Sequence, residues 1–95
     1  MRRIVWSSRA RRDLYEANDW YEQASPELPL LLTERVEAGL LKLLEFPNIG
    51  SPVPDSSARK WRVRHTPYLI FYRSTADGVR ILKVRHVRSN WAAEP

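Results

Sequence analysis

Apolar residues follow a helical spacing through the first half of the chain. From residue 8 onward they recur every three or four positions, which places them on one stripe of a helix that runs to about residue 24. These positions are Ala10, Leu14, Ala17, Tyr21 and Ala24. A β-branched and aromatic run at residues 3–6 precedes the helix and ends at Ser7 and Ser8, a residue type that caps helix N-termini. The chain is therefore predicted to open with a strand that leads into a capped helix.

A second helix is predicted after the Ser25–Pro26–Glu27 run, with its start close to Leu28 and its end by Phe46–Pro47. Its apolar positions extend so far around the helix that most of it is expected to lie in the core. Because few residues separate the two helices, they are expected to pack as an antiparallel hairpin. The charged residues of the first helix, Asp13 and Glu16 among them, are interpreted as a solvated face.

The second half of the chain has the pattern of strands. Three runs rich in Val, Ile, Tyr, Phe and Trp, at residues 60–66, 68–74 and 79–87, follow a Pro- and Ser-rich loop at 48–58. Asp77–Gly78 is a strong hairpin signal between the last two runs. We predict a single α+β domain over residues 1–95 of order β-α-α-β-β-β, in which the N-terminal helical hairpin packs on one face of a mainly antiparallel sheet. Residues 90–95 are expected to form a loosely held tail.

Charge is distributed unevenly over this predicted fold. The formal net charge is +5, and residues 51–95 hold nine basic and three acidic side chains whereas residues 1–50 hold seven and eight. Strand alternation places Lys60, Arg62 and Arg64 on one side of the first C-terminal run and Trp61, Val63 and His65 on the other. Thirteen of the sixteen cations are Arg, whose planar fork suits phosphate and carboxylate groups. An anionic partner is favoured, although a basic surface also serves solubility alone.

Several functional classes are excluded by what the sequence lacks. Without cysteine there is no disulfide, thiolate metal site or thiol nucleophile, and two histidines twenty-one residues apart make a poor metal site. No glycine-rich phosphate loop is present, so no cofactor is expected. The longest apolar stretch, residues 28–44, contains four charged residues, and no signal peptide is visible. We expect a cytoplasmic protein with no membrane contact.

His86 is the one plausible general base at neutral pH. Cations surround it in the sequence, and Tyr68 or Tyr72 is a candidate acid, but no carboxylate is placed near it by the local pattern. A hydrogen-bonded structural role for His86 is the favoured interpretation. The uncovered basic sheet suits either single-stranded RNA or an acidic protein segment, and the residues alone do not choose between them.

Four segments, in this order along the chain, resemble the RelE/ParE superfamily of toxins from bacterial type II toxin–antitoxin systems. They are Ala10–Leu14 with Tyr21, Leu44–Gly50, Tyr68–Arg73 and Ile81–Arg88. Val84–Arg88 is similar to the terminal-strand motif of ParE-like members, and the Lys-rich cluster and terminal Tyr expected of RelE are lacking. The resemblance therefore implies the ParE branch and covers nearly the whole chain.

The resemblance implies a toxin held inactive by a cognate, ParD-like antitoxin, with higher-order toxin–antitoxin assembly as a further expectation. In the ParE branch the implied target is DNA gyrase, and the toxin is then not an enzyme. The alternative is a RelE-like, ribosome-dependent mRNA endoribonuclease that uses His86 with Arg62, Arg73 and Arg85. A degenerate member that poisons nothing is a third possibility. The expected target- and partner-binding residues are Lys60, Arg62, Arg64, Arg73, Lys83, Arg85, His86, Arg88 and Trp91.

Overall fold

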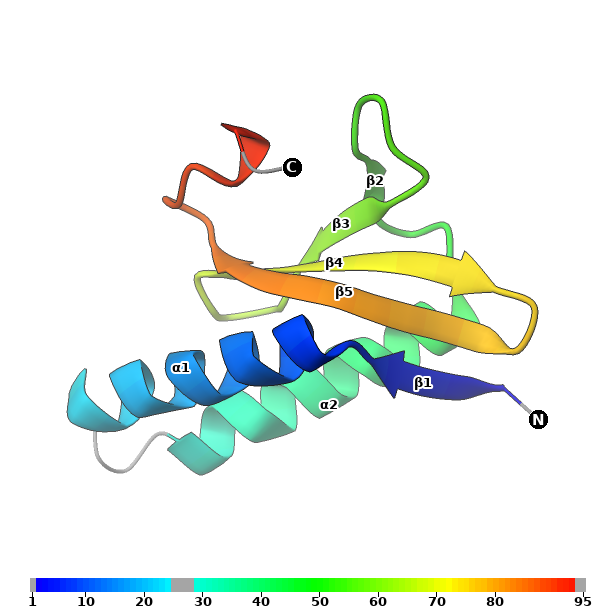
Figure 1. The fold of residues 1–95 in the computed structure, drawn as a ribbon. Coiled ribbons are helices and arrows are strands. Elements are labelled where there is room, and N and C mark those ends of the chain that lie inside the picture. Colours follow the sequence, from blue (N-terminus) through cyan, green and yellow to red (C-terminus); the bar gives the residue numbers. More distant parts are fainter. Residues whose placement is uncertain (1, 25–28, 94–95) are drawn as a thin grey trace.

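A five-stranded sheet covered on one side by two helices makes up the fold (Figure 1). The computed structural model describes residues 2–24 and 29–93. The elements are β1 (Arg3–Trp6), α1 (Ser8–Ala24), α2 (Pro29–Glu45), β2 (Ser51–Pro52), β3 (Arg59–Arg62), β4 (Tyr68–Thr75), β5 (Gly78–His86) and a 3₁₀ helix η1 (Trp91–Ala93). The strand order is β1-β5-β4-β3-β2, with β1 parallel to β5 and the other neighbours antiparallel. The predicted α+β class and the helical hairpin on one face are confirmed.

Ser7 joins the first strand to the first helix. Its Oγ accepts the Ala10 N–H at 3.0 Å, which caps α1, and donates to the Leu82 carbonyl of β5 at 2.8 Å. The predicted cap is therefore confirmed, and it also fixes the start of α1 against the sheet. The second helix ends at Glu45 as predicted, while its expected start at residues 25–28 lies outside the described residues.

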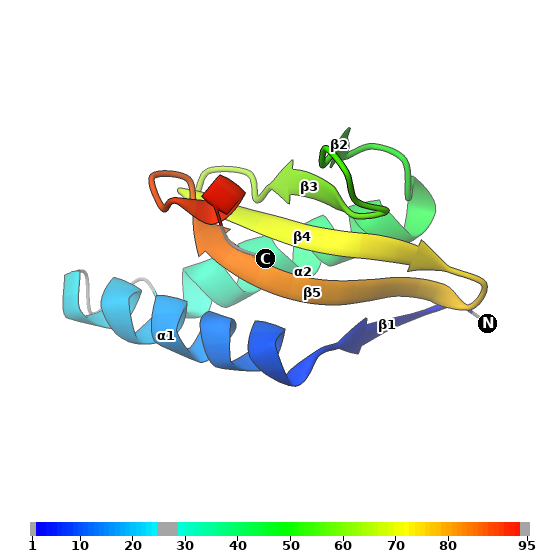
Figure 2. The same cartoon turned by 45° about the horizontal axis from the view of Figure 1, so that its top comes forward.

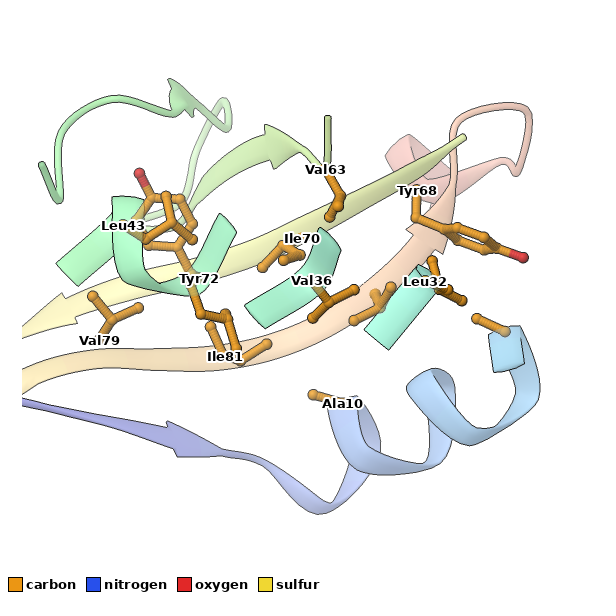
Figure 3. Packing of buried hydrophobic residues seen from close by; sticks show 13 residues of the cluster. Ala10, Leu32, Val36, Leu43, Val63, Tyr68, Ile70, Tyr72, Val79 and Ile81 are labelled. Carbon is orange, nitrogen blue, oxygen red and sulfur yellow. The ribbon is translucent and has the colours of Figure 1, made fainter. Parts of the chain in front are cut away.

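The core lies between the helices and the sheet (Figure 3). Its fully buried large side chains are Leu32, Leu43, Val63, Ile70, Tyr72, Val79 and Ile81. The Tyr72 hydroxyl donates to the Pro47 carbonyl at 2.7 Å and accepts the Gly50 N–H at 2.9 Å, so its polar atom is satisfied. Burial raises the pKa of Tyr72 above its usual value. Tyr72 is thus a structural residue and does not reach a surface where it would act as an acid.

Two local predictions in the second half of the chain are wrong. The loop predicted over residues 48–58 contains the short strand β2, and β3 ends at Arg62 instead of continuing to Thr66. The chain turns after Val63, because Thr66 Oγ1 donates to the Val63 carbonyl and His65 adopts a φ of 63°. Arg64 and His65 are therefore exposed turn residues and do not continue the strand alternation with Lys60 and Arg62.

The described part of the chain ends on the side of the sheet away from the helices (Figure 2). Within the stretch 90–95, residues 91–93 form η1, and the Trp91 ring packs on the Phe71 ring of β4 at 5.3 Å between centroids. Residues 94 and 95 lie outside the described part of the chain. The C-terminal turn therefore covers part of the sheet face that the helices leave open.

Candidate functional site

The sheet face opposite the helices, called here the outer face, carries most of the predicted cationic site. Strand register arranges it in three rows, one across β4 and β5 and two across β3, β4 and β5. The rows are Arg73 with Arg80, then Lys60 with Phe71 and Lys83, then Arg62 with Leu69 and Arg85. Successive rows are two residues apart along β4, or about 6.8 Å, whereas Arg80 and Lys83 on β5 are three residues apart. Five of the predicted site residues are therefore attached to the outer face of the sheet: Lys60, Arg62, Arg73, Lys83 and Arg85.

A bulge in β5 brings Arg80 to the outer face. Phe71 pairs with Lys83 whereas Tyr72 pairs with Ile81, so Leu82 is an extra residue with no partner on β4. Simple alternation would have put Arg80 on the side opposite Lys83 and Arg85. Arg80 is not among the predicted site residues, and nothing in the local sequence signals this bulge. Arg3, which also lies on the outer face through its pairing with Gly78, was missed as well.

Like charges are placed side by side on the outer face. Arg73 and Arg80 are directly opposite each other on neighbouring strands, and both are exposed. Such a pair destabilises a sheet unless an anion screens it. None of the five strands contains an acidic residue, and no ion pair involves either Arg within residues 2–24 and 29–93. This end of the outer face therefore carries uncompensated positive charge.

An aromatic pair occupies the middle of the outer face. The Lys83 Nζ lies 4.8 Å from the centroid of the Phe71 ring, and the Lys60 Nζ lies 5.2 Å from that of the Trp91 ring. Phe71 is only 3% exposed. A hollow of about 570 Å³ lies beside this pair, between the 53–58 loop and η1. The two rings thus pack on each other and carry a cation each.

At the β5 edge, Asp13 of α1 binds a strand that β1 does not reach. β1 pairs only with residues 78–81, so the Val84 N–H has no strand partner there and donates to Asp13 Oδ2 at 2.9 Å. The Arg85 guanidinium donates to the same oxygen at 2.5 Å, with the Asp13 and Arg85 side chains 12% and 16% exposed. Asp13 was expected on a solvated face; that prediction is wrong, because the carboxylate replaces a missing strand.

His86 lies on the helix side of the sheet. Its ring contacts those of Tyr68 and Trp20, at 5.6 and 6.4 Å between centroids, and its Nδ1 accepts the Arg88 N–H at 3.1 Å. With these aromatic residues and Asp13, Glu16 and Arg85 it lines a cleft of about 460 Å³. Two carboxylates from α1 therefore line the same cleft as His86, although the local sequence pattern places none near it. Burial and the neighbouring Tyr21 raise the pKa of Tyr68, which keeps its phenol protonated at neutral pH.

The four residues of the nuclease alternative do not meet at one place. His86 faces the helices, whereas Arg62 and Arg73 start from the outer face. Arg62 pairs with Leu69, and Arg73 is four residues further along β4, or about 13 Å away. Arg62 Nε also donates to the Thr66 carbonyl at 2.9 Å. The remaining predicted residues, Arg64 and Arg88, are exposed in the turns at the Tyr68 end of β4.

A separate apolar groove of about 460 Å³ lies between α1 and α2. Its walls are mainly Trp6, Leu14, Tyr15, Val36 and Leu40, and its polar lining residues are Arg11, Asn18, Thr33 and Glu37. Tyr15 is 72% exposed, and the buried Asn18 Oδ1 has no hydrogen-bond donor among the described residues. The groove has no sequence signal, because neither helix carries a motif that distinguishes an open stripe from a covered one.

Residues 2–24 and 29–93 contain neither a membrane-spanning helix nor a metal-binding cluster. No helix in that part of the chain has both the length and the apolar content to cross a bilayer. Nor do three or more His, Asp or Glu side chains there converge as a metal ion requires.

Three comparisons place the chain among known proteins. A family model described as the ParE toxin of the type II toxin–antitoxin system parDE matches residues 4–91. The chain is 33% identical over 90 residues to the protein named "Putative toxin Y4kP" of Sinorhizobium fredii (strain NBRC 101917 / NGR234), covering 95% of this chain and 93% of that protein. A solved structure of a chromosomal ParDE toxin–antitoxin system from P. aeruginosa matches with a TM-score of 0.75 and 21% identity, over 90% of this chain and 96% of that one. At that identity the structural match shows a shared fold.

Proposed function

Because the chain belongs to the ParE toxin family of type II toxin–antitoxin systems, we propose that it inhibits DNA gyrase, blocks replication, and is neutralised in the cytoplasm by a ParD-like antitoxin. The observation that supports gyrase as the target is the outer face, whose cations lie on strands that contain no carboxylate. Gyrase acts on DNA, which is a polyanion, so a basic toxin surface is attracted to the DNA that gyrase holds. The proposed contact residues are Lys60, Arg62, Arg64, Arg73, Lys83, Arg85, His86, Arg88 and Trp91, to which Arg3 and Arg80 are added.

Geometry favours gyrase inhibition over mRNA cleavage. General acid–base cleavage needs the base and the charge-stabilising cations around one phosphate. His86 lies on the helix side, and the outer-face Arg62 and Arg73 are about 13 Å apart along β4, so one phosphate does not reach all three.

The proposed activity predicts a specific biochemical result. Purified toxin at micromolar concentration should inhibit supercoiling of relaxed plasmid by gyrase and leave cell-free translation intact, and addition of the antitoxin should restore supercoiling. Translation arrest with codon-positioned mRNA cuts, lost in a His86→Ala variant, would contradict the proposal in favour of the nuclease. Overexpression with no growth arrest would point to a degenerate toxin.

The groove between α1 and α2 is the proposed docking site for an amphipathic segment of the antitoxin. Burying its apolar walls supplies affinity, and Arg11 offers a positive charge to an acidic segment, against the one negative charge of Glu37. The rest of the antitoxin is then proposed to wrap the toxin and to join higher-order assemblies.

A charged substitution at the groove should weaken antitoxin binding. We expect Tyr15→Asp to raise the Kd for the antitoxin by about thirtyfold or more, because a large exposed aromatic is a frequent binding hot spot and the added carboxylate repels an acidic partner. Isothermal titration calorimetry with a purified ParD-like antitoxin measures this. The matched control is Phe46→Asp, a half-exposed aromatic after α2, which should leave the Kd within threefold. Equal losses in both variants would argue against the groove.

A further inference from the structure

The outer face offers positive charge that the protein itself does not neutralise. Arg73 and Arg80 are direct cross-strand neighbours, exposed, with no ion pair to either within the described ranges. Repulsion between the two guanidinium groups destabilises the pairing of β4 with β5. An anion bound between them would attract both groups and stabilise the pairing. Because the bulge at Leu82 is what turns Arg80 toward Arg73, the fold creates this pair where simple alternation would separate it.

From this arrangement we infer that the outer face binds the phosphate backbone of duplex DNA directly, without gyrase or any other protein. The inference goes beyond the proposed function, since it concerns the toxin and DNA alone. The three rows extend over about 14 Å along the strands, a length over which a duplex presents roughly eight phosphates on its two strands. Each row contributes cations to a backbone that follows the strands: Arg73 and Arg80, then Lys60 and Lys83, then Arg62, whereas Arg85 of the third row is paired with Asp13.

Duplex DNA fits this surface better than a single strand does. Proteins that hold single strands stack bases on free aromatic rings. On the outer face, Phe71 is buried beneath Trp91, and each ring already carries a lysine ammonium. Phosphate contacts are therefore the main interaction that the outer face can offer. Such contacts bind duplex DNA with little dependence on its sequence.

Fluorescence anisotropy of a labelled 30-base-pair duplex, titrated with the full chain at several salt concentrations, tests the inference. We expect binding in the micromolar range that weakens steeply with salt. The variant Arg73→Gln/Arg80→Gln should weaken binding at least tenfold at 50 mM salt and reduce the slope of log K against log salt by about 2, since two phosphate contacts are removed.

The matched control removes the same charge from the helical layer. Arg12→Gln/Lys42→Gln changes two exposed cations on α1 and α2 and should leave affinity within twofold. No binding at 100 μM protein and 50 mM salt would overturn the inference, as would equal losses in the two double variants. Tighter binding of a single strand, or of an acidic peptide of equal charge, would assign the face to another partner and also overturn it. Gyrase inhibition without duplex binding would leave the proposed function standing and refute this inference alone.

Discussion

Replacing Gly78 with alanine should lower the free energy of unfolding by about 3 kcal/mol or more, one of the largest losses open to a single methyl group in this domain. Gly78 has a φ of 149°, which side-chain-bearing residues rarely adopt. A Cβ there would lie 2.0 Å from the Arg3 carbonyl oxygen and 2.7 Å from the Arg3 nitrogen. The backbone of β1 would have to move away from β5, its only partner in the sheet.

Urea denaturation of the two proteins measures this effect. The control is Asp77→Ala, an exposed substitution in the same turn, which should change the free energy of unfolding by no more than about 0.5 kcal/mol. Loss of the parallel β1–β5 pairing should also appear as faster hydrogen exchange at the Arg3 and Ser7 amides, which donate to the Asp77 and Ile81 carbonyls. An unchanged midpoint in Gly78→Ala would show that β1 does not need this close approach.

Removal of the Asp13 carboxylate should be comparably costly. Asp13→Ala leaves the Val84 N–H without an acceptor and the largely buried Arg85 guanidinium without its anion, a loss of about 3 kcal/mol. Asp13→Asn should lose less, because an amide oxygen still accepts from Val84. The measurement is again urea denaturation, with Asp19→Ala as the control, an exposed carboxylate on the same helix.

A double-mutant cycle separates the two contacts of Asp13. Combining Asp13→Ala with Arg85→Met should show a coupling of about 1–3 kcal/mol, because Asp13 and Arg85 share one short hydrogen bond. If Asp13→Ala were as mild as Asp19→Ala, the carboxylate would be a surface charge, as the sequence pattern alone suggested, and not the residue that completes the β5 edge.

Hydrophobic periodicity was sufficient to predict the helices and strands that bury one regular row of apolar residues. The stripe through Ala10, Leu14 and Ala17 and the run around Leu40 located both helices, since helix spacing depends only on neighbouring residues. The same holds for β4 and β5, where Asp77–Gly78 marked the hairpin. The candidate cations on β3 and β4 were found this way as well.

What the sequence did not reveal depends on contacts between distant residues. The Leu82 bulge, which adds Arg80 to the outer face, is held by the Ser7 side chain 75 residues away. Asp13 shows no local sign of its bond to Val84, although its position between Ala10 and Ala17 on the buried stripe is a usable signal in retrospect. The packing of Trp91 on Phe71 likewise joins the chain end to a central strand.

The central claim is that the outer face is the surface with which this toxin acts, and a gyrase supercoiling assay with three proteins tests it most directly. The wild type, the outer-face variant Arg73→Gln/Arg80→Gln and the helical-layer variant Arg12→Gln/Lys42→Gln are compared at equal concentration, after melting curves show that all are folded. The outer-face variant should need at least ten times more protein for half inhibition, with the helical-layer variant within twofold of the wild type. An outer-face variant as potent as the wild type would contradict the claim.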